Sequence, residues 1–194
     1  TTGEGGSVLS QNKAFIKKIK LLRTHGLNYY KGPKHKNLSS YDMQSLGFNY
    51  RITDFQCALG TSQLKKLSKF IKKKRKIASL YNREFKDDAR FVIPKEIADN
   101  YHAYHLYPLL INFNIIKITK KILYQKMLKS KIKLQNHYLP MYRHSYYKKN
   151  FNFNIKDFPN SENFYEKQIS LPLFYGSKKS EILKVIKNIK NICK

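Results

Sequence analysis

The sequence predicts a chain of mixed α/β class, with an irregular first part, one long helix, and a small α+β domain at the C-terminal end. Glycine, proline and serine break up the apolar pattern through the first part of the chain. Apolar residues then recur at steps of three and four over about thirty positions, which indicates a helix. After Pro94, segments with strand and helix patterns follow one another, as is typical of a sheet covered by helices on one face.

The first part begins with a Gly-rich turn at residues 1–6 and a short strand candidate at residues 7–10. Residues 14–22 place their apolar side chains on one face, which predicts a short amphipathic helix. From residue 24 to residue 51, glycines, a proline and serines predict a long irregular loop. Loops of this length are uncommon inside compact domains and are often functional.

A long helix is predicted from Thr53 to Lys86. Thr53 and Gln56 have the spacing of a capping box, in which each side chain accepts the other residue's backbone N–H. Apolar residues then recur at helical steps as far as Phe85. The basic run 72–76 lies inside this helix, and a solvated helix face explains it better than a binding patch does.

The last part contains alternating strand and helix patterns. Residues 101–113 are rich in aromatic and β-branched side chains and predict a strand. The elements expected after it are a helix over 117–130, a strand over 132–138, an aromatic loop over 142–159, a short helix over 162–167, a strand over 169–173, and a last helix capped by Ser177. Together they predict the small α+β domain.

The net charge of +27 and the isoelectric point near 10.0 leave two explanations. One is a nucleic-acid or anionic-membrane partner. The other is the base composition of the genome, because the abundant residues Lys, Asn, Ile, Tyr and Phe are those that AT-rich codons encode. Nucleic-acid binders favour Arg, whose planar fork grips phosphate, and Arg is scarce here. We therefore expect no nucleic-acid partner. A basic nucleic-acid-binding module stays as the alternative. The logarithm of its affinity for nucleic acid would fall linearly with the logarithm of the salt concentration.

Several classes of protein are not supported by the sequence. No apolar run is long enough to span a bilayer, and the first residues lack a signal-peptide pattern, so we expect a cytoplasmic protein without a membrane partner. Cys57 and Cys193 match no metal or redox spacing. His102 and His105 are three positions apart on a predicted strand, so they would point to opposite faces. No metal site is therefore expected.

Three segments have the residue types of a binding site. A structural role explains the first and the third of them better, and explains the second equally well. The Gly-rich turn at residues 3–6 could cradle a phosphate. Asn49 and Arg51 stand just before the long helix, where backbone amides favour an anion and both side chains add donors. His137 and Tyr138 follow a predicted strand and can hydrogen bond to a polar ligand.

In combination and order, these segments resemble the DegT/StrS-type sugar aminotransferase family. The resemblance covers essentially the whole chain. It rests on TTGEGG at residues 1–6, LRTHG at 22–26, LGFNYRITDFQCALG at 46–60, HLYP at 105–108, NHYLPMY at 136–142 and ISLP at 169–172. The blocks at 46–60 and 137–142 are most similar to the branch that acts in pseudaminic acid synthesis.

The resemblance implies the C-terminal part of the fold type I architecture of pyridoxal-phosphate-dependent transferases. Residues 1–53 would be the tail of the large α/β domain, which binds the cofactor and includes an active-site loop. Residues 54–88 would be the interdomain helix, and residues 89–194 the small C-terminal α+β domain. The resemblance also implies a homodimer with shared active sites.

The implied chemistry is the transfer of an amino group from glutamate to C4 of a UDP-linked 4-keto-6-deoxy-N-acetylhexosamine, with pyridoxal 5'-phosphate as cofactor. Another keto-sugar nucleotide is the alternative substrate. The family's Schiff-base lysine lies three residues before the first Thr of the TTGEGG motif. It is therefore expected upstream of Thr1, and the 194 residues are expected to be inactive alone.

The resemblance also implies roles for individual residues. Asn49 matches the family asparagine that reaches across the dimer to the cofactor phosphate or the substrate, and Arg51 stands beside it. His25 lies in a loop expected near the mouth of the active site. The segment that lines the nucleotide-sugar site is matched by His137, Tyr138, Leu139, Pro140 and Tyr142.

Overall fold

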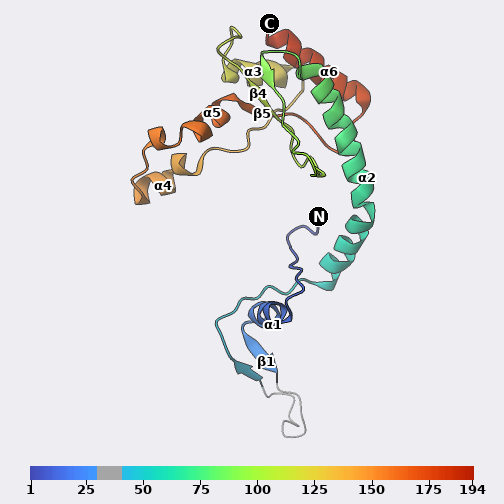
Figure 1. Ribbon diagram of the computed structural model, residues 1–194, viewed down its shortest axis with the longest axis vertical. Helices are drawn as coiled ribbons and strands as arrows, with labels where there is room; N and C mark the ends of the chain where they lie inside the picture. Colours follow the sequence, from blue (N-terminus) through green and yellow to red (C-terminus); the bar gives the residue numbers. More distant parts are fainter. Residues whose placement is uncertain (30–40) are drawn as a thin grey trace. The chain divides into compact units, whose positions relative to one another are not determined.

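A computed structural model describes residues 1–29 and 41–194 of the chain (Figure 1). The chain divides into two compact units, which we call unit 1 (Thr1–Leu67) and unit 2 (Ser68–Lys194). The long helix α2 (Asp54–Phe85) contributes to both of them. Residues 30–40, which are part of the predicted loop, lie outside the described residues.

Unit 1 contains the helix α1 (Lys13–Leu22), which confirms the amphipathic helix predicted there. Its first turn is capped by Asn12, whose side chain accepts the backbone N–H of Phe15 at 3.1 Å. The strand predicted at residues 7–10 is absent from the described structure. Val8 and Leu9 are 56% and 92% exposed, so this segment lacks the burial and pairing that stabilise a strand.

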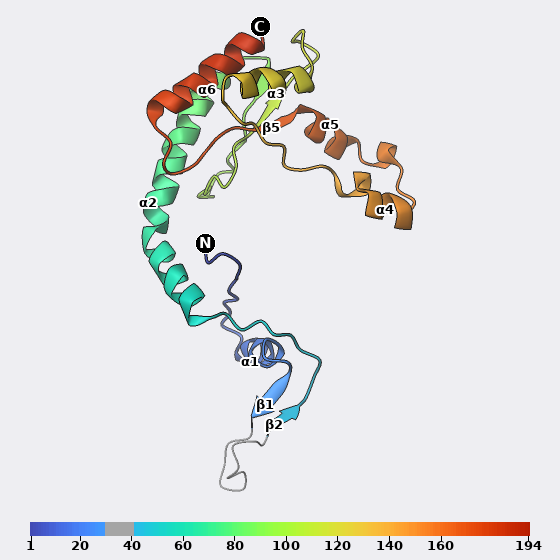
Figure 2. The ribbon, with the colours of Figure 1, turned by 180° about the vertical axis from the view of Figure 1, so that it is seen from behind.

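Two short strands, β1 (Leu27–Tyr29) and β2 (Tyr41–Met43), form an antiparallel pair in which Leu27 faces Met43 (Figure 2). The prediction of an irregular loop was wrong for these residues. Three residues are too few to show the alternation by which a strand is recognised.

The chain turns sharply between α1 and β1, at His25 and Gly26. Both residues have positive φ, 61° and 70°. A Cβ on Gly26 would lie 1.7 Å from the carbonyl oxygen of Ser45. Glycine is therefore the residue that fits this position, because it has no Cβ and adopts positive φ without strain.

The capping box predicted for α2 is confirmed. The backbone N–H of Thr53 donates to Gln56 Oε1 at 3.0 Å, and that of Gln56 donates to Thr53 Oγ1 at 3.4 Å. At the other end of the helix, Tyr81 and Phe85 are fully buried in the core of unit 2. The buried hydrophobic residues of the described chain all belong to unit 2, whereas unit 1 exposes residues such as Phe55, at 90%.

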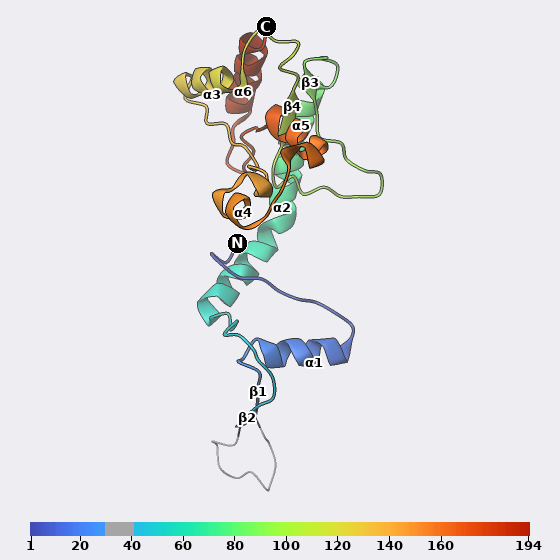
Figure 3. The same ribbon diagram turned by 90° about the vertical axis from the view of Figure 1, so that its left-hand side faces the viewer.

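Unit 2 is built on a three-stranded antiparallel sheet in the order β3-β4-β5. The paired strands β3 and β4 are labelled in Figure 3. The strands are β3 (Phe91–Val92), β4 (Pro108–Ile111) and β5 (Gln168–Ser170). Leu109 on β4 faces Ile169 on β5, and both are fully buried. Helices α3 (Lys120–Lys129) and α6 (Lys179–Ile192) bury their apolar residues in the same core and contact each other (Figure 1). The α+β character predicted for this region is confirmed.

Two predicted strands of unit 2 are shorter than expected. Residues 101–107 are irregular, so His102 and His105 lie on no strand. The carbonyl of His102 accepts Arg75 Nη1 at 2.9 Å, and its Nδ1 accepts the N–H of Tyr104 at 2.9 Å, which removes these groups from strand pairing. Within 132–138, the pairing is a single bridge between Gln135 and Ser170.

The last helix begins one residue later than predicted. Its N-cap is Lys178, whose backbone N–H donates to the Glu181 carboxylate at 2.8 Å. The Ser177 hydroxyl, which was expected to cap the helix, is buried and has no hydrogen-bond partner among the described residues.

The aromatic segment predicted as a loop contains short helices. They are η1 (Met141–Arg143), α4 (Ser145–Asn150), η2 (Ile155–Asp157) and, after them, α5 (Pro159–Lys167). Tyr142 stacks on Phe158 with ring centroids 4.3 Å apart, and Arg143 forms an ion pair with Glu162.

In the described part of the chain, no helix combines the length and apolarity needed to cross a membrane.

Candidate cofactor and substrate sites

A hollow in unit 1 lies between the Gly-rich turn, α1 and the start of α2. Its volume is about 830 Å³. The residues that line it include two of the predicted site residues, Asn49 and Arg51, and also Gly5 and Gly6 of the turn. The two motifs that the sequence presented separately therefore meet at one place.

The hollow carries a positive charge. Lys20, Arg23 and Arg51 line it, against the single carboxylate of Glu4. Among the described residues, the side chain of Asn49 has no hydrogen-bond partner and Arg51 has no ion pair. Guanidinium and amide N–H groups are the donors that a phosphate group accepts. This donor set therefore fits the phosphate of pyridoxal phosphate.

Backbone hydrogen bonds hold Asn49 beside the end of α1. The N–H of Phe48 donates to the carbonyl of Leu22 at 2.7 Å, and that of Tyr50 donates to Arg23 at 2.9 Å. Thr24 and Asn49 form an antiparallel bridge. Because the residues on both sides are fixed, Asn49 keeps its place in the lining of the hollow while its amide stays available.

The Gly-rich turn is fixed to the start of α2 by one side chain. Gln56 Nε2 donates to the carbonyl of Glu4 at 2.9 Å. The sequence pattern identified Gln56 only as a helix cap, and Lys20 and Arg23 were not predicted as site residues. The sequence could have indicated Arg23, because it follows Lys20 at the basic end of an amphipathic helix.

His25 does not belong to the residues that line the hollow. Its backbone N–H donates to the carbonyl of Phe48 at 2.9 Å. The contacts of His25 therefore support the turn after α1, and its predicted place at an active-site mouth stays a prediction.

The predicted substrate residues of unit 2 occupy a short stretch that leads into η1. His137 is half-buried and hydrogen bonds to Gln168 and Ser170. Tyr138 and Leu139 are exposed, and Pro140 is the N-cap of η1. This stretch presents polar and apolar groups next to one another at the surface.

The hydroxyl of Tyr142 has a hydrogen-bond partner within unit 2. Its hydroxyl donates to Glu162 Oε1 at 2.8 Å, and Arg143 contacts the same carboxylate. The hydrogen bond with Arg143 lowers the pKa of Glu162, so this carboxylate stays charged and holds both side chains. In this structure Tyr142 positions the segment and does not present a free hydroxyl.

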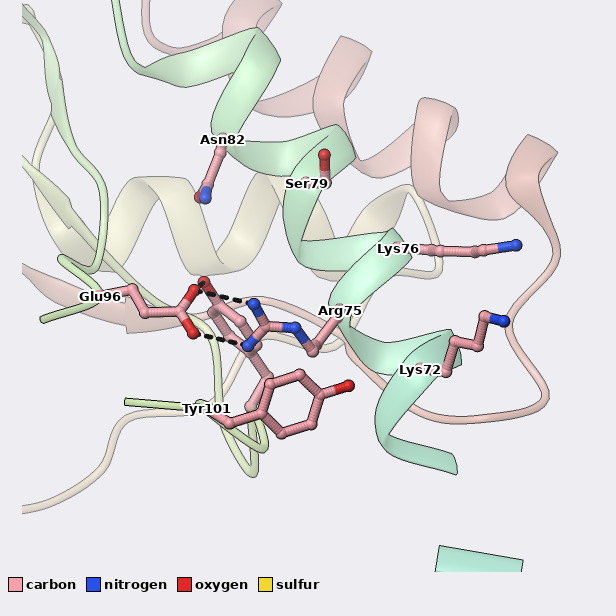
Figure 4. Close-up of a pocket in the computed structure, with 8 residues that line it drawn as sticks. Lys72, Arg75, Lys76, Ser79, Asn82, Glu96 and Tyr101 are labelled. Carbon is pink, nitrogen blue, oxygen red and sulfur yellow. Dashed lines mark hydrogen bonds and ion pairs between the residues drawn. The ribbon is translucent and has the colours of Figure 1, made fainter. Parts of the chain in front are cut away.

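Another hollow, of about 460 Å³, lies in unit 2 and contains part of the basic run of α2 (Figure 4). Arg75 pairs with Glu96 at 2.6 Å, and its guanidinium lies 4.3 Å from the centroid of the Tyr101 ring. Lys72 and Lys76 extend away from this pair (Figure 4). Arg75 thus serves to hold residues 96–104 against α2, while the two lysines fit the solvated face predicted from the sequence.

A further hollow of unit 2, of about 530 Å³, contains Lys120 and Tyr124. Lys120 Nζ donates to Asn136 Oδ1 at 3.0 Å and to the carbonyl of Tyr165 at 2.5 Å. Burial lowers the pKa of Lys120 to about 8, because charging a buried amine costs hydration.

The lowered pKa of Lys120 predicts a pH dependence of stability. Between about pH 8 and the ordinary pKa of 10.5, the unfolded chain holds the Lys120 proton and the folded chain does not. The contribution of Lys120 to the free energy of unfolding therefore rises with pH across this window. Lys120→Met should flatten that rise, measured by urea unfolding at several pH values. Lys121→Met, at an exposed neighbour, should leave it unchanged, and equal slopes in both variants would contradict the prediction.

The chain matches a family of known proteins over nearly all its length. A model of the DegT/DnrJ/EryC1/StrS aminotransferase family matches residues 1–190. The chain is 41% identical over 172 residues to the UDP-4-amino-4,6-dideoxy-N-acetyl-beta-L-altrosamine transaminase of Campylobacter jejuni, covering 89% of this chain and 43% of the relative. It is 36% identical over 194 residues to an uncharacterized protein of Methanocaldococcus jannaschii, covering 99% and 50%.

A solved structure gives the same result. Helicobacter pylori PseC, an aminotransferase involved in the biosynthesis of pseudoaminic acid, superposes with a TM-score of 0.86 at 30% identity. The superposition covers 100% of this chain and 50% of that one. The chain therefore spans about half the length of the relatives it matches.

Proposed function

Because the chain belongs to the DegT/DnrJ/EryC1/StrS aminotransferase family, we propose that it forms part of a pyridoxal-phosphate-dependent aminotransferase that acts on a nucleotide-linked keto-sugar. The fold is the C-terminal part of the fold type I architecture of this family. The reaction that we propose is the transfer of an amino group from glutamate to C4 of a UDP-linked 4-keto-6-deoxy-N-acetylhexosamine. The relatives named for altrosamine transamination, at 34% and 41% identity, support this substrate.

The hollow of unit 1 is the observation that carries the proposal. The bound cofactor would supply the electron sink that allows an amino group to move between two carbon skeletons. The Asn49 amide would donate to the cofactor phosphate, and Arg51 would balance its charge. Lys20 and Arg23 would raise the positive potential around them.

The remaining roles follow from the same proposal. His137 and Tyr138 would hydrogen bond to the nucleotide-sugar, and Leu139 and Pro140 would supply apolar contact. His25 keeps its predicted place near the site without an assigned chemical role. We propose a homodimer in which Asn49 serves the partner subunit's cofactor, and the cytoplasm as the compartment, where nucleotide-sugars and glutamate are available.

Substitution of Asn49 tests the cofactor part. In the full-length enzyme that carries this chain, Asn49→Ala should weaken binding of pyridoxal phosphate about 10- to 100-fold, because a hydrogen bond to a charged group is lost. A cofactor titration followed by absorbance measures this change. Asn28→Ala, on β1 and outside the hollow, is the matched control. An unchanged affinity in Asn49→Ala would remove Asn49 from the cofactor site.

Turnover of defined substrates tests the reaction. The full-length enzyme, with glutamate as donor, should aminate the UDP-linked 4-keto-6-deoxy-N-acetylhexosamine with a higher kcat/KM than keto-sugars linked to other nucleotides. A higher kcat/KM with another nucleotide-linked keto-sugar would keep the class of reaction and replace the substrate.

A further inference from the structure

His137 is held by two residues of β5, Gln168 and Ser170, which have no role in the proposed function. The backbone N–H of His137 donates to Gln168 Oε1 at 3.1 Å, and its ring Nδ1 lies 2.7 Å from Ser170 Oγ. Gln168 Nε2 also lies 2.7 Å from Ser170 Oγ. Gln168 and Ser170 are buried, with 1% and 4% of their surfaces exposed. The three residues therefore form a closed network whose glutamine and serine are shielded from water.

The direction of each hydrogen bond in this network follows from one group that can only donate. The backbone N–H of His137 requires an acceptor, so the Gln168 atom beside it must be the oxygen. The other end of the Gln168 amide is then NH₂, which donates to Ser170 Oγ. Ser170 is left with one lone pair and one proton, and His137 Nδ1 is its remaining neighbour.

Two arrangements of the last bond are conceivable, and burial distinguishes them. If Nδ1 carried a proton and donated it, the Ser170 O–H would have no acceptor, because no other partner for Ser170 Oγ exists among the described residues. A buried hydroxyl without an acceptor is unfavourable. The favoured arrangement has the Ser170 O–H donating to an unprotonated Nδ1. The ring proton of His137 is then on Nε2.

We propose that Gln168 and Ser170 are positioning residues that keep His137 in the Nε2–H tautomer, so that His137 offers one outward N–H donor to an acceptor oxygen of the nucleotide-sugar. Nε2 has no partner in the part of the chain that the structure describes. Matching groups are phosphate oxygens and the carbonyl oxygen of an N-acetyl substituent, which accept and do not donate. The proton arrangement stands on the geometry alone, whereas the identity of the ligand rests on the proposed function.

Nitrogen NMR on the full-length protein that carries this chain tests the proton arrangement. With ¹⁵N-labelled histidine, the ring correlation spectrum of His137 should show an unprotonated Nδ1 and a protonated Nε2. The signal is assigned by its loss in His137→Gln. Ser170→Ala should shift the Nδ1 resonance toward its protonated position, because the donor to Nδ1 is gone. Ser170→Thr keeps the hydroxyl and should retain the original pattern.

Ser177→Ala is the matched control, because Ser177 is an equally buried serine of unit 2 with an unpartnered hydroxyl among the described residues. This variant should leave the His137 signals in place. A protonated Nδ1 in the unaltered chain would overturn the proposal. So would a spectrum that is the same in Ser170→Ala and the unaltered chain. If Ser170→Ala does not fold, the tautomer in the unaltered chain and in Ser170→Thr still decides.

Kinetics of the full-length enzyme test the ligand. Ser170→Ala should raise KM for the keto-sugar nucleotide about tenfold with little change in kcat, since it weakens uniform binding. Ser170→Thr should restore KM. If the tautomer is as proposed but KM is unchanged, the network stands and the contact between His137 and the nucleotide-sugar is overturned. Failure of the proposed reaction itself would appear as an absence of turnover in the unaltered enzyme.

Discussion

Replacement of Phe85 by alanine is expected to lower the free energy of unfolding of unit 2 by about 3–5 kcal/mol. Phe85 is fully buried at the C-terminal end of α2. Its ring meets Phe91 of β3 edge-on, with centroids 4.9 Å apart, and lies 6.2 Å from Tyr81. Truncation would remove the transfer energy of a large aromatic ring and leave a cavity where helix and sheet meet.

The same helix offers a control for Phe85→Ala. Phe55 is 90% exposed, so Phe55→Ala removes a ring of equal size without opening a cavity, and stability should change by no more than about 0.5 kcal/mol. Urea unfolding followed by near-UV circular dichroism measures both variants. Losses of similar size would show that burial does not set the contribution of these rings.

Replacement of Gly26 by alanine is expected to disrupt unit 1. At φ of 70°, an alanine costs about 1–2 kcal/mol by itself. Its Cβ would also overlap the Ser45 carbonyl at 1.7 Å, so the backbone must move. That movement would break the hydrogen bond from Gln44 N–H to the Gly26 carbonyl. Because the described residues of unit 1 add no buried hydrophobic side chain to the core, little packing would resist the change.

A two-dimensional amide spectrum measures this effect. The signals of residues 21–29 and 44–50 should shift or disappear in Gly26→Ala, while those of unit 2 stay in place. Gly6→Ala is the control, since a Cβ there would meet no atom within 4 Å and φ is not positive. An unchanged spectrum for Gly26→Ala would contradict the close approach of residue 26 to Ser45.

The helices were largely predictable from the sequence, because their signals are local. Thr53 and Gln56 mark the start of α2 within one turn, and the apolar periodicity of α1 and α6 needs only ten to fourteen residues. The strands were less predictable. The strand β3 has two residues and β1 has three, which is too short for an alternating pattern.

The contacts within the two candidate sites also could not be predicted from local sequence patterns. Asn49, Arg51 and the Gly-rich turn were each identified from the sequence, but they line one hollow in which residues 52 positions apart, Gln56 and Glu4, are hydrogen bonded. His137 was also identified, whereas its partners Gln168 and Ser170 lie 31 and 33 positions away. Contacts over such separations are made by the fold, and no local pattern in the sequence marks them.

Gln56 illustrates how few amino acids a position can accept when it serves two neighbours. Its Oε1 accepts the Thr53 N–H, and its Nε2 donates to the Glu4 carbonyl. Glutamate would keep the acceptor and lose the donor, and lysine would do the reverse. Asparagine carries both groups on a side chain one methylene shorter. A screen of all substitutions at this codon should therefore recover glutamine, because each alternative frees either the helix start or the glycine turn.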